Sequence, residues 1–131
     1  MSTNLSKQWL DKAAEDLVVA RLVLAEGHTA HACFLSQQCI EKSLKAYLIE
    51  KVGLYPRVHK LVDLVTECES LDSAFSRFLS DCIVVDQYYI PTRYPDGIPG
   101  AGPSGTPSDI EAKEAIEAAE RILKFVQAQL P

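Results

Sequence analysis

The segment CFLSQQCIEKSLKAYL, residues 33–48, decides the fold of this chain. Its apolar side chains recur at intervals of three and four residues, which is the period of a helix and not the alternation of a strand. They are Cys33, Phe34, Ile40, Leu44, Tyr47 and Leu48. Because they cover a broad face, this helix should be the most buried one. We predict that it spans residues 29–51, with Thr29 capping its start and Gly53 following its end.

The helical period continues on both sides of this segment, and no stretch alternates as a half-buried strand does. The further helices are predicted over residues 3–26, 60–70, 72–90 and 108–129. In the last of them, Ser108 followed by Glu111 is typical of a capping box. We therefore predict an all-α fold, one domain over residues 1–131, built as an up-and-down four-helix bundle with one short extra helix.

A loop rich in proline and glycine precedes the last helix. Five of the seven prolines and four of the six glycines fall between Pro91 and Pro107, a composition that excludes helix and central strand. Residues 94–106 hold little apolar surface to bury, so we expect them to be the most mobile part of the molecule and the first to be cut by a protease.

Composition and termini limit the function classes. A chain of 131 residues has the size of one domain, and its net charge of −5 argues against a surface that binds nucleic acid throughout, so no DNA partner is expected. The N-terminus has no apolar stretch after a basic start, and the longest apolar runs fall far short of the ~20 residues that span a bilayer. We expect a cytoplasmic protein without a membrane association.

The four cysteines are spaced unlike any zinc signature and lie within apolar helical patterns. They are Cys33, Cys39, Cys68 and Cys82. We interpret them as reduced core thiols and expect no metal site.

Charge is distributed unevenly along the chain. Residues 41–60 carry five cationic and two acidic side chains, a net of +3, whereas residues 61–90 carry six acids and one arginine, a net of −5. One interpretation is solvated helix faces, with cations near a helix C-terminus where the macrodipole favours them. The other is an anion site, built from Lys42, Lys45, Arg57, His59 and Lys60 and completed by Arg93.

Three segments resemble, in order and spacing, the HEPN family of small helical domains. They are WLDKAAEDLVVA (residues 9–20), the segment 33–48 quoted above, and HKLVDL (59–64) followed by YYIPTRYPD (88–96). The resemblance implies a helical bundle that commonly dimerises and that pairs with a separate, minimal nucleotidyltransferase. Many relatives form toxin–antitoxin pairs in which the helical partner is a ribonuclease.

The chain departs from the ribonuclease members of that family. They share an Arg followed, after four to six residues, by a His late in the chain, whereas no histidine here follows His59. Arg93 therefore lacks that partner, and Arg21 with His28 has the spacing but brackets the end of a helix. Leu61 occupies the place, two residues after a histidine, where some relatives carry a modified tyrosine. These departures favour a non-catalytic protein.

Gln37, Glu41 and Lys45 are spaced i, i+4, i+8 and share one face of the central helix. One interpretation is structural, a Glu–Lys pair in favourable order beside a buried Gln that bonds another helix. A second resemblance supports a site, because aminoglycoside nucleotidyltransferases have a similar helical domain in which a Glu and a Lys, one turn apart, reach the nucleotide. The catalytic half of those enzymes is absent from this chain, so a role of this kind implies a partner protein.

The predicted nucleotide- or anion-binding residues are Glu41, Lys42, Lys45, His59, Arg93 and Tyr94, with ATP as a representative ligand and no catalytic residue or resident cofactor. His59 has a simpler interpretation, a local hydrogen bond at the start of the third helix. For Arg93 the alternative is an ion pair with Asp86 or Asp96 that anchors the loop. The leading function is a HEPN-type partner of a nucleotidyltransferase, and the alternatives are a ribonuclease toxin and a structural dimerisation module.

Overall fold

Helices, and no strand, make up the part of the chain that the computed structural model describes, residues 4–89 and 106–130. Three of them are long and three are short. In chain order they are α1 (Asn4–Ala25), α2 (Thr29–Val52), α3 (Leu61–Leu71), the 3-10 helix η1 (Ser73–Phe78), α4 (Leu79–Asp86) and α5 (Asp109–Gln129). The all-α prediction is confirmed, and the predicted ends of α1, α2, α3 and α5 lie within one residue of the observed ends. The proline- and glycine-rich loop, apart from Thr106 and Pro107, lies outside the described residues. Its mobility therefore stays a prediction.

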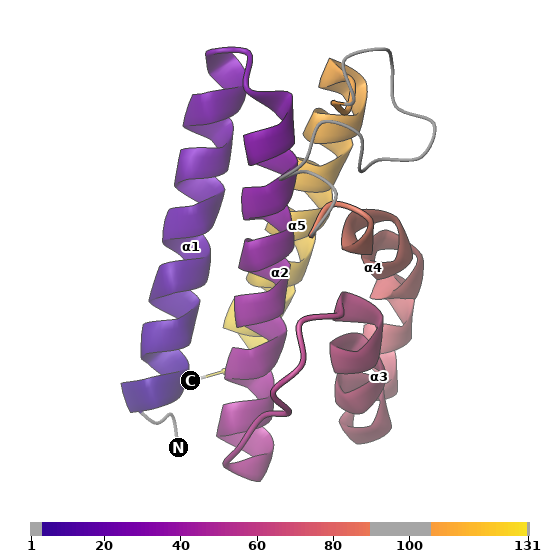
Figure 1. The fold of residues 1–131 in the computed structure, drawn as a ribbon. Coiled ribbons are helices and arrows are strands. Elements are labelled where there is room, and N and C mark those ends of the chain that lie inside the picture. Colours follow the sequence, from indigo (N-terminus) through magenta and orange to yellow (C-terminus); the bar gives the residue numbers. More distant parts are fainter. Residues whose placement is uncertain (1–3, 90–105, 131) are drawn as a thin grey trace.

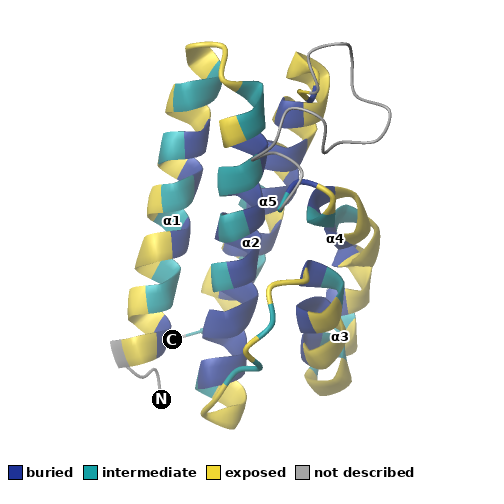
Figure 2. Ribbon diagram, in the orientation of Figure 1, coloured by how far each residue is buried: buried dark blue, intermediate teal, exposed yellow. Residues whose placement is uncertain are grey.

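The long helices α1, α2 and α5 lie side by side, and α3 and α4 pack on the other side of α2 from α1 (Figure 1). The chain reverses between α1 and α2 at Gly27, whose φ of 87° favours glycine. Helix α2 therefore has neighbours on several sides, and fourteen of its residues are buried (Figure 2). This confirms that the segment quoted first forms the most buried helix.

The structure corrects the helix predicted over residues 72–90. A 3-10 helix occupies its first part, and the α-helical part ends at Asp86. The Asp72 side chain accepts a hydrogen bond from the Ala74 N–H at 3.0 Å and starts this segment. With three residues per turn, a 3-10 helix directs Phe75 and Phe78 to the same side, and both are buried in the core.

Helix caps were predicted with mixed success. Ser108 Oγ accepts from the Glu111 N–H at 3.0 Å, and the Glu111 carboxylate accepts from the Ser108 N–H at 2.8 Å, so the capping box is confirmed. Gly53 ends α2 in the left-handed region with a φ of 88°. The cap predicted at Thr29 is wrong, because Thr29 is already helical and His28 precedes it without a side-chain cap.

All four cysteines are free and buried, as predicted. Burial raises the pKa of Cys33, Cys39 and Cys68 to about 12 and also raises the pKa of Cys82. At neutral pH the thiolate, which is the reactive form, is therefore scarce.

We expect the native protein to resist thiol labelling at pH 7. An aromatic disulfide reagent should find almost no reactive thiol in the folded chain, and four per chain after denaturation in guanidinium. Absorbance at the wavelength of the released thiolate measures both values. Rapid labelling of even one cysteine in the folded protein would contradict the burial described here.

The described helices include none that is long and apolar enough to cross a bilayer.

Candidate functional site

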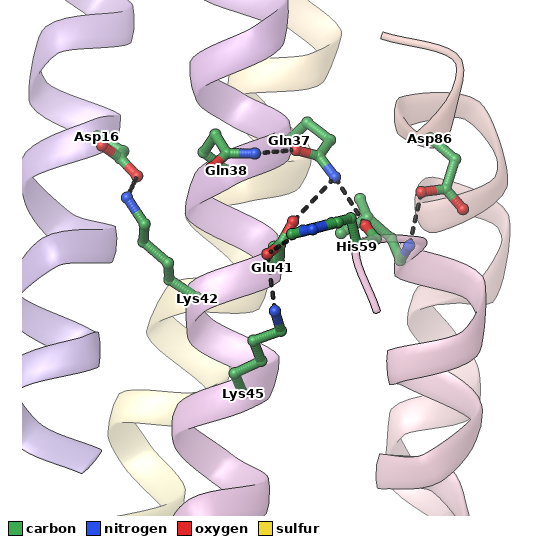
Figure 3. Close-up of polar contacts among 9 residues, drawn as sticks. Asp16, Gln37, Gln38, Glu41, Lys42, Lys45, His59 and Asp86 are labelled. Atoms are coloured by element: carbon green, nitrogen blue, oxygen red, sulfur yellow. Dashed lines mark hydrogen bonds and ion pairs between the residues drawn. The ribbon is translucent and has the colours of Figure 1, made fainter. Parts of the chain in front are cut away.

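A buried carboxylate, Glu41, lies at the centre of a polar cluster on α2 (Figure 3). Its Oε2 atom accepts from Lys45 Nζ at 2.9 Å and contacts His59 Nδ1 at 3.1 Å. Its Oε1 atom lies 3.5 Å from Gln37 Nε2, which also donates to the backbone carbonyl of His59 at 3.0 Å. The predicted Glu–Lys pair is present, whereas the buried Gln37 bonds His59, which precedes α3, and not another helix.

Lys45, a predicted nucleotide- or anion-binding residue, is enclosed by the protein. Its side chain is only 4% exposed, and Nζ lies 5.1 Å from the ring centre of Tyr55 and 5.7 Å from that of Trp9. These are cation–π distances. The carboxylate and two rings surround the charge, so a phosphate could reach Lys45 only by displacing Glu41.

The His59 side chain is exposed and yet held by two contacts. The side chain is 58% exposed, its Nδ1 contacts Glu41, and its ring stacks on Tyr89 with the centroids 5.2 Å apart and an angle of 11° between the planes. Because a carboxylate accepts hydrogen bonds, His59 Nδ1 is the donor in this contact. The predicted local hydrogen bond is wrong, since His59 bonds a residue on α2.

Asp86, at the end of α4, fixes the start of α3. Its two carboxylate oxygens accept from the backbone N–H groups of Leu61 at 2.6 Å and Val62 at 3.0 Å. Burial raises the pKa of the Asp86 carboxyl, and the two N–H donors offset this only in part. The contact fixes the end of the connector between α2 and α3, residues 53–60, which contains His59. Nothing in the sequence pattern indicated it, because the partners lie 24 and 25 residues apart.

The structure does not bring all the predicted site residues together. Lys42 lies toward α1, where its Nζ pairs with Asp16 at 2.7 Å, away from Glu41 (Figure 3). Arg93 and Tyr94 lie outside the described residues. Arg57 and Lys60, which flank His59, are exposed and form no ion pair within residues 4–89 and 106–130. In that part of the chain no three His, Cys, Asp or Glu side chains form a metal site.

The arrangement therefore consists of a helical bundle, a buried ion pair and an exposed imidazole that two cations flank in sequence. A family model described as "HEPN domain" matches residues 6–129, and the chain belongs to the HEPN family. In "Putative toxin MJ1304" of Methanocaldococcus jannaschii, 28% of aligned residues are identical, over 93% of this chain and 86% of that protein.

Three solved structures have folds similar to that of this chain. TT1696 from Thermus thermophilus has a TM-score of 0.86 and 35% identity, covering 98% of this chain and all of that one. ST0689, described as an archaeal HEPN homologue, has a TM-score of 0.76 and 33% identity over 96% of this chain and 98% of its own. A HEPN domain protein from Thermotoga maritima has a TM-score of 0.74 and 27% identity, covering 93% of this chain and 96% of its own.

Proposed function

We propose that this chain is the non-catalytic, helical member of a two-protein unit and binds a separate, minimal nucleotidyltransferase. The observation that carries the proposal is the Glu41–Lys45 pair, joined at 2.9 Å one helical turn apart beside an exposed histidine. A Glu and a Lys with this spacing reach the nucleotide in the aminoglycoside nucleotidyltransferases that the segment resembles. In the proposed unit, the separate nucleotidyltransferase supplies the catalytic half of those enzymes.

A nucleotide is the proposed ligand of this unit. Phosphate groups are bound by charge-assisted hydrogen bonds from Arg and Lys side chains. Glu41 and Lys45 are buried and paired with each other, so in the isolated chain they hold His59 in place and do not contact the nucleotide. The exposed cations Arg57 and Lys60 are the groups that a phosphate reaches first. Arg93 and Tyr94 remain proposed members of the site, together with Lys42 if its pair with Asp16 opens.

A ribonuclease toxin is the second candidate function. It is supported by the Methanocaldococcus jannaschii relative, whose name contains the word toxin. Against it stands the sequence itself, because no histidine follows His59 and the late Arg–His pair is missing. Without such a pair, the chain lacks the acid–base groups that promote RNA cleavage in those relatives.

Co-expression with the nucleotidyltransferase encoded nearest to this chain tests the proposal. The two proteins should co-purify as one complex, and the pure helical chain should leave total RNA intact over hours. Separate elution of the two proteins would contradict the proposed partnership. Degradation of RNA by the pure chain would establish the second candidate instead.

We also propose that the chain forms a homodimer. Helix α1 packs on α2 and α5 but still exposes Val18 and Leu22, one helical turn apart, and Leu5 near its start. Light scattering at micromolar concentration should give about twice the 14.5 kDa of one chain. A mass near that of a single chain would contradict the dimer, and Leu22→Glu, expected to weaken it, would test whether α1 forms the interface.

A further inference from the structure

His59 combines exposure with rigid placement, which is unusual for a surface side chain. Three contacts hold it: its carbonyl accepts from Gln37 at 3.0 Å, its Nδ1 lies 3.1 Å from Glu41, and one ring face rests on Tyr89. A surface side chain normally keeps its rotamer freedom, and ordering it has an entropic cost. In His59 the ordered side chain is a flat ring that is 58% exposed, so it is held in place and still open to a ligand.

We propose that the outer face of His59, supported by Tyr89, stacks the base of a nucleotide whose phosphates bind Arg57 and Lys60. This proposal deepens the proposed function and depends on it for the choice of a nucleotide. Aromatic side chains, histidine included, stack nucleobases on their flat faces. A ring already supported from behind offers this contact with little further loss of freedom.

The neighbouring cations complete the argument. Arg57 and Lys60 lie two residues before and one residue after His59, and consecutive Cα atoms are about 3.8 Å apart. Their long side chains are exposed and hold no ion pair in the described ranges. Lys60 feels the charge of Asp86, but that carboxylate is already bonded to two backbone N–H groups. Lys45, enclosed by Glu41 and two rings, instead holds the Glu41 carboxylate in place behind the imidazole.

Calorimetric titration of the pure chain with ATP tests the proposal. The wild type should bind, and His59→Ala should bind about tenfold more weakly, as expected for the loss of one stacked ring. His59→Phe should stay within about threefold of the wild type. Both variants lose the contact with Glu41, so their comparison isolates the ring. His31→Ala, which removes an exposed histidine at the start of α2, should leave the affinity unchanged.

Tripolyphosphate, which has no base, separates the two parts of the site. Arg57→Ala and Lys60→Ala should weaken its binding, whereas His59→Ala should not, and Lys113→Ala on α5 serves as the charge control. The proposal is overturned if the wild type ignores millimolar ATP, if His59→Ala binds as tightly as the wild type, or if His59→Phe is as weak as His59→Ala. Co-purification of the wild type with the nucleotidyltransferase is scored separately, so failure of the base-stacking site and failure of the partnership give different results.

Discussion

Replacing Glu41 with alanine should lower the free energy of unfolding by about 3–5 kcal/mol, the usual loss when one partner of a buried ion pair is removed. The substitution leaves the Lys45 ammonium, whose side chain is 4% exposed, without its carboxylate at 2.9 Å. The rings of Trp9 and Tyr55 offset only part of this loss, since one cation–π contact contributes about 0.5–2 kcal/mol. Urea denaturation followed by circular dichroism at 222 nm measures the change.

Two control variants show whether the buried pair is the cause. Glu117→Ala removes an exposed glutamate from α5 that forms no ion pair in the described part of the chain, and it should change stability by less than about 0.5 kcal/mol. The double variant Glu41→Leu, Lys45→Met replaces both charges by apolar groups and should recover most of the loss. If Glu41→Ala were as stable as Glu117→Ala, the cluster would be solvated and Lys45 would be open to ligands.

The parts of the fold that follow from local pattern could be predicted from the sequence. The period of three and four residues in segment 33–48 and the Ser108–Glu111 pair each depend on residues within a turn or two of one another. The ion pair of Glu41 with Lys45 is also local, because residues four apart lie on one face of a helix. Local spacing could not show that this face is covered, since Trp9 and Tyr55 reach Lys45 from other segments.

Apart from the local error at the Thr29 cap, the features that prediction missed lie where two segments distant in sequence meet. His59 contacts Glu41 across 18 residues, and Asp86 binds the start of α3 across 25, so neither contact leaves a periodic signal. Phe75 and Phe78, three residues apart, fit one face of an α-helix and one side of a 3-10 helix equally well. Packing against Tyr47 and Phe125 selects the 3-10 geometry here.

Replacing Phe75 with alanine is the second change expected to have a large effect, a loss of about 3–5 kcal/mol. Phe75 is fully buried in η1, with ring centroids 4.5 Å from Tyr47 on α2 and 5.1 Å from Phe125 on α5. Removing it leaves a cavity and takes one ring contact from each of Tyr47 and Phe125. Thermal unfolding and urea titration should both report the loss, and Ile83→Ala, which truncates a 57%-exposed side chain on α4, should stay within about 0.5 kcal/mol of the wild type.

The location of the damage distinguishes an anchoring role from a general loss of packing. Phe75 joins the short helices α3, η1 and α4 to the pair α2 and α5, and these short helices carry the Asp86 contact that holds the connector of His59. In the Phe75→Ala variant, hydrogen exchange should therefore accelerate first at the amides of α3 and α4, while α2 keeps most of its protection. Loosening of the short helices α3, η1 and α4 should also weaken ATP binding at His59 before the bundle unfolds. Uniform acceleration across all helices would show instead that the core opens as one body, and that Phe75 stabilises it without anchoring the short helices.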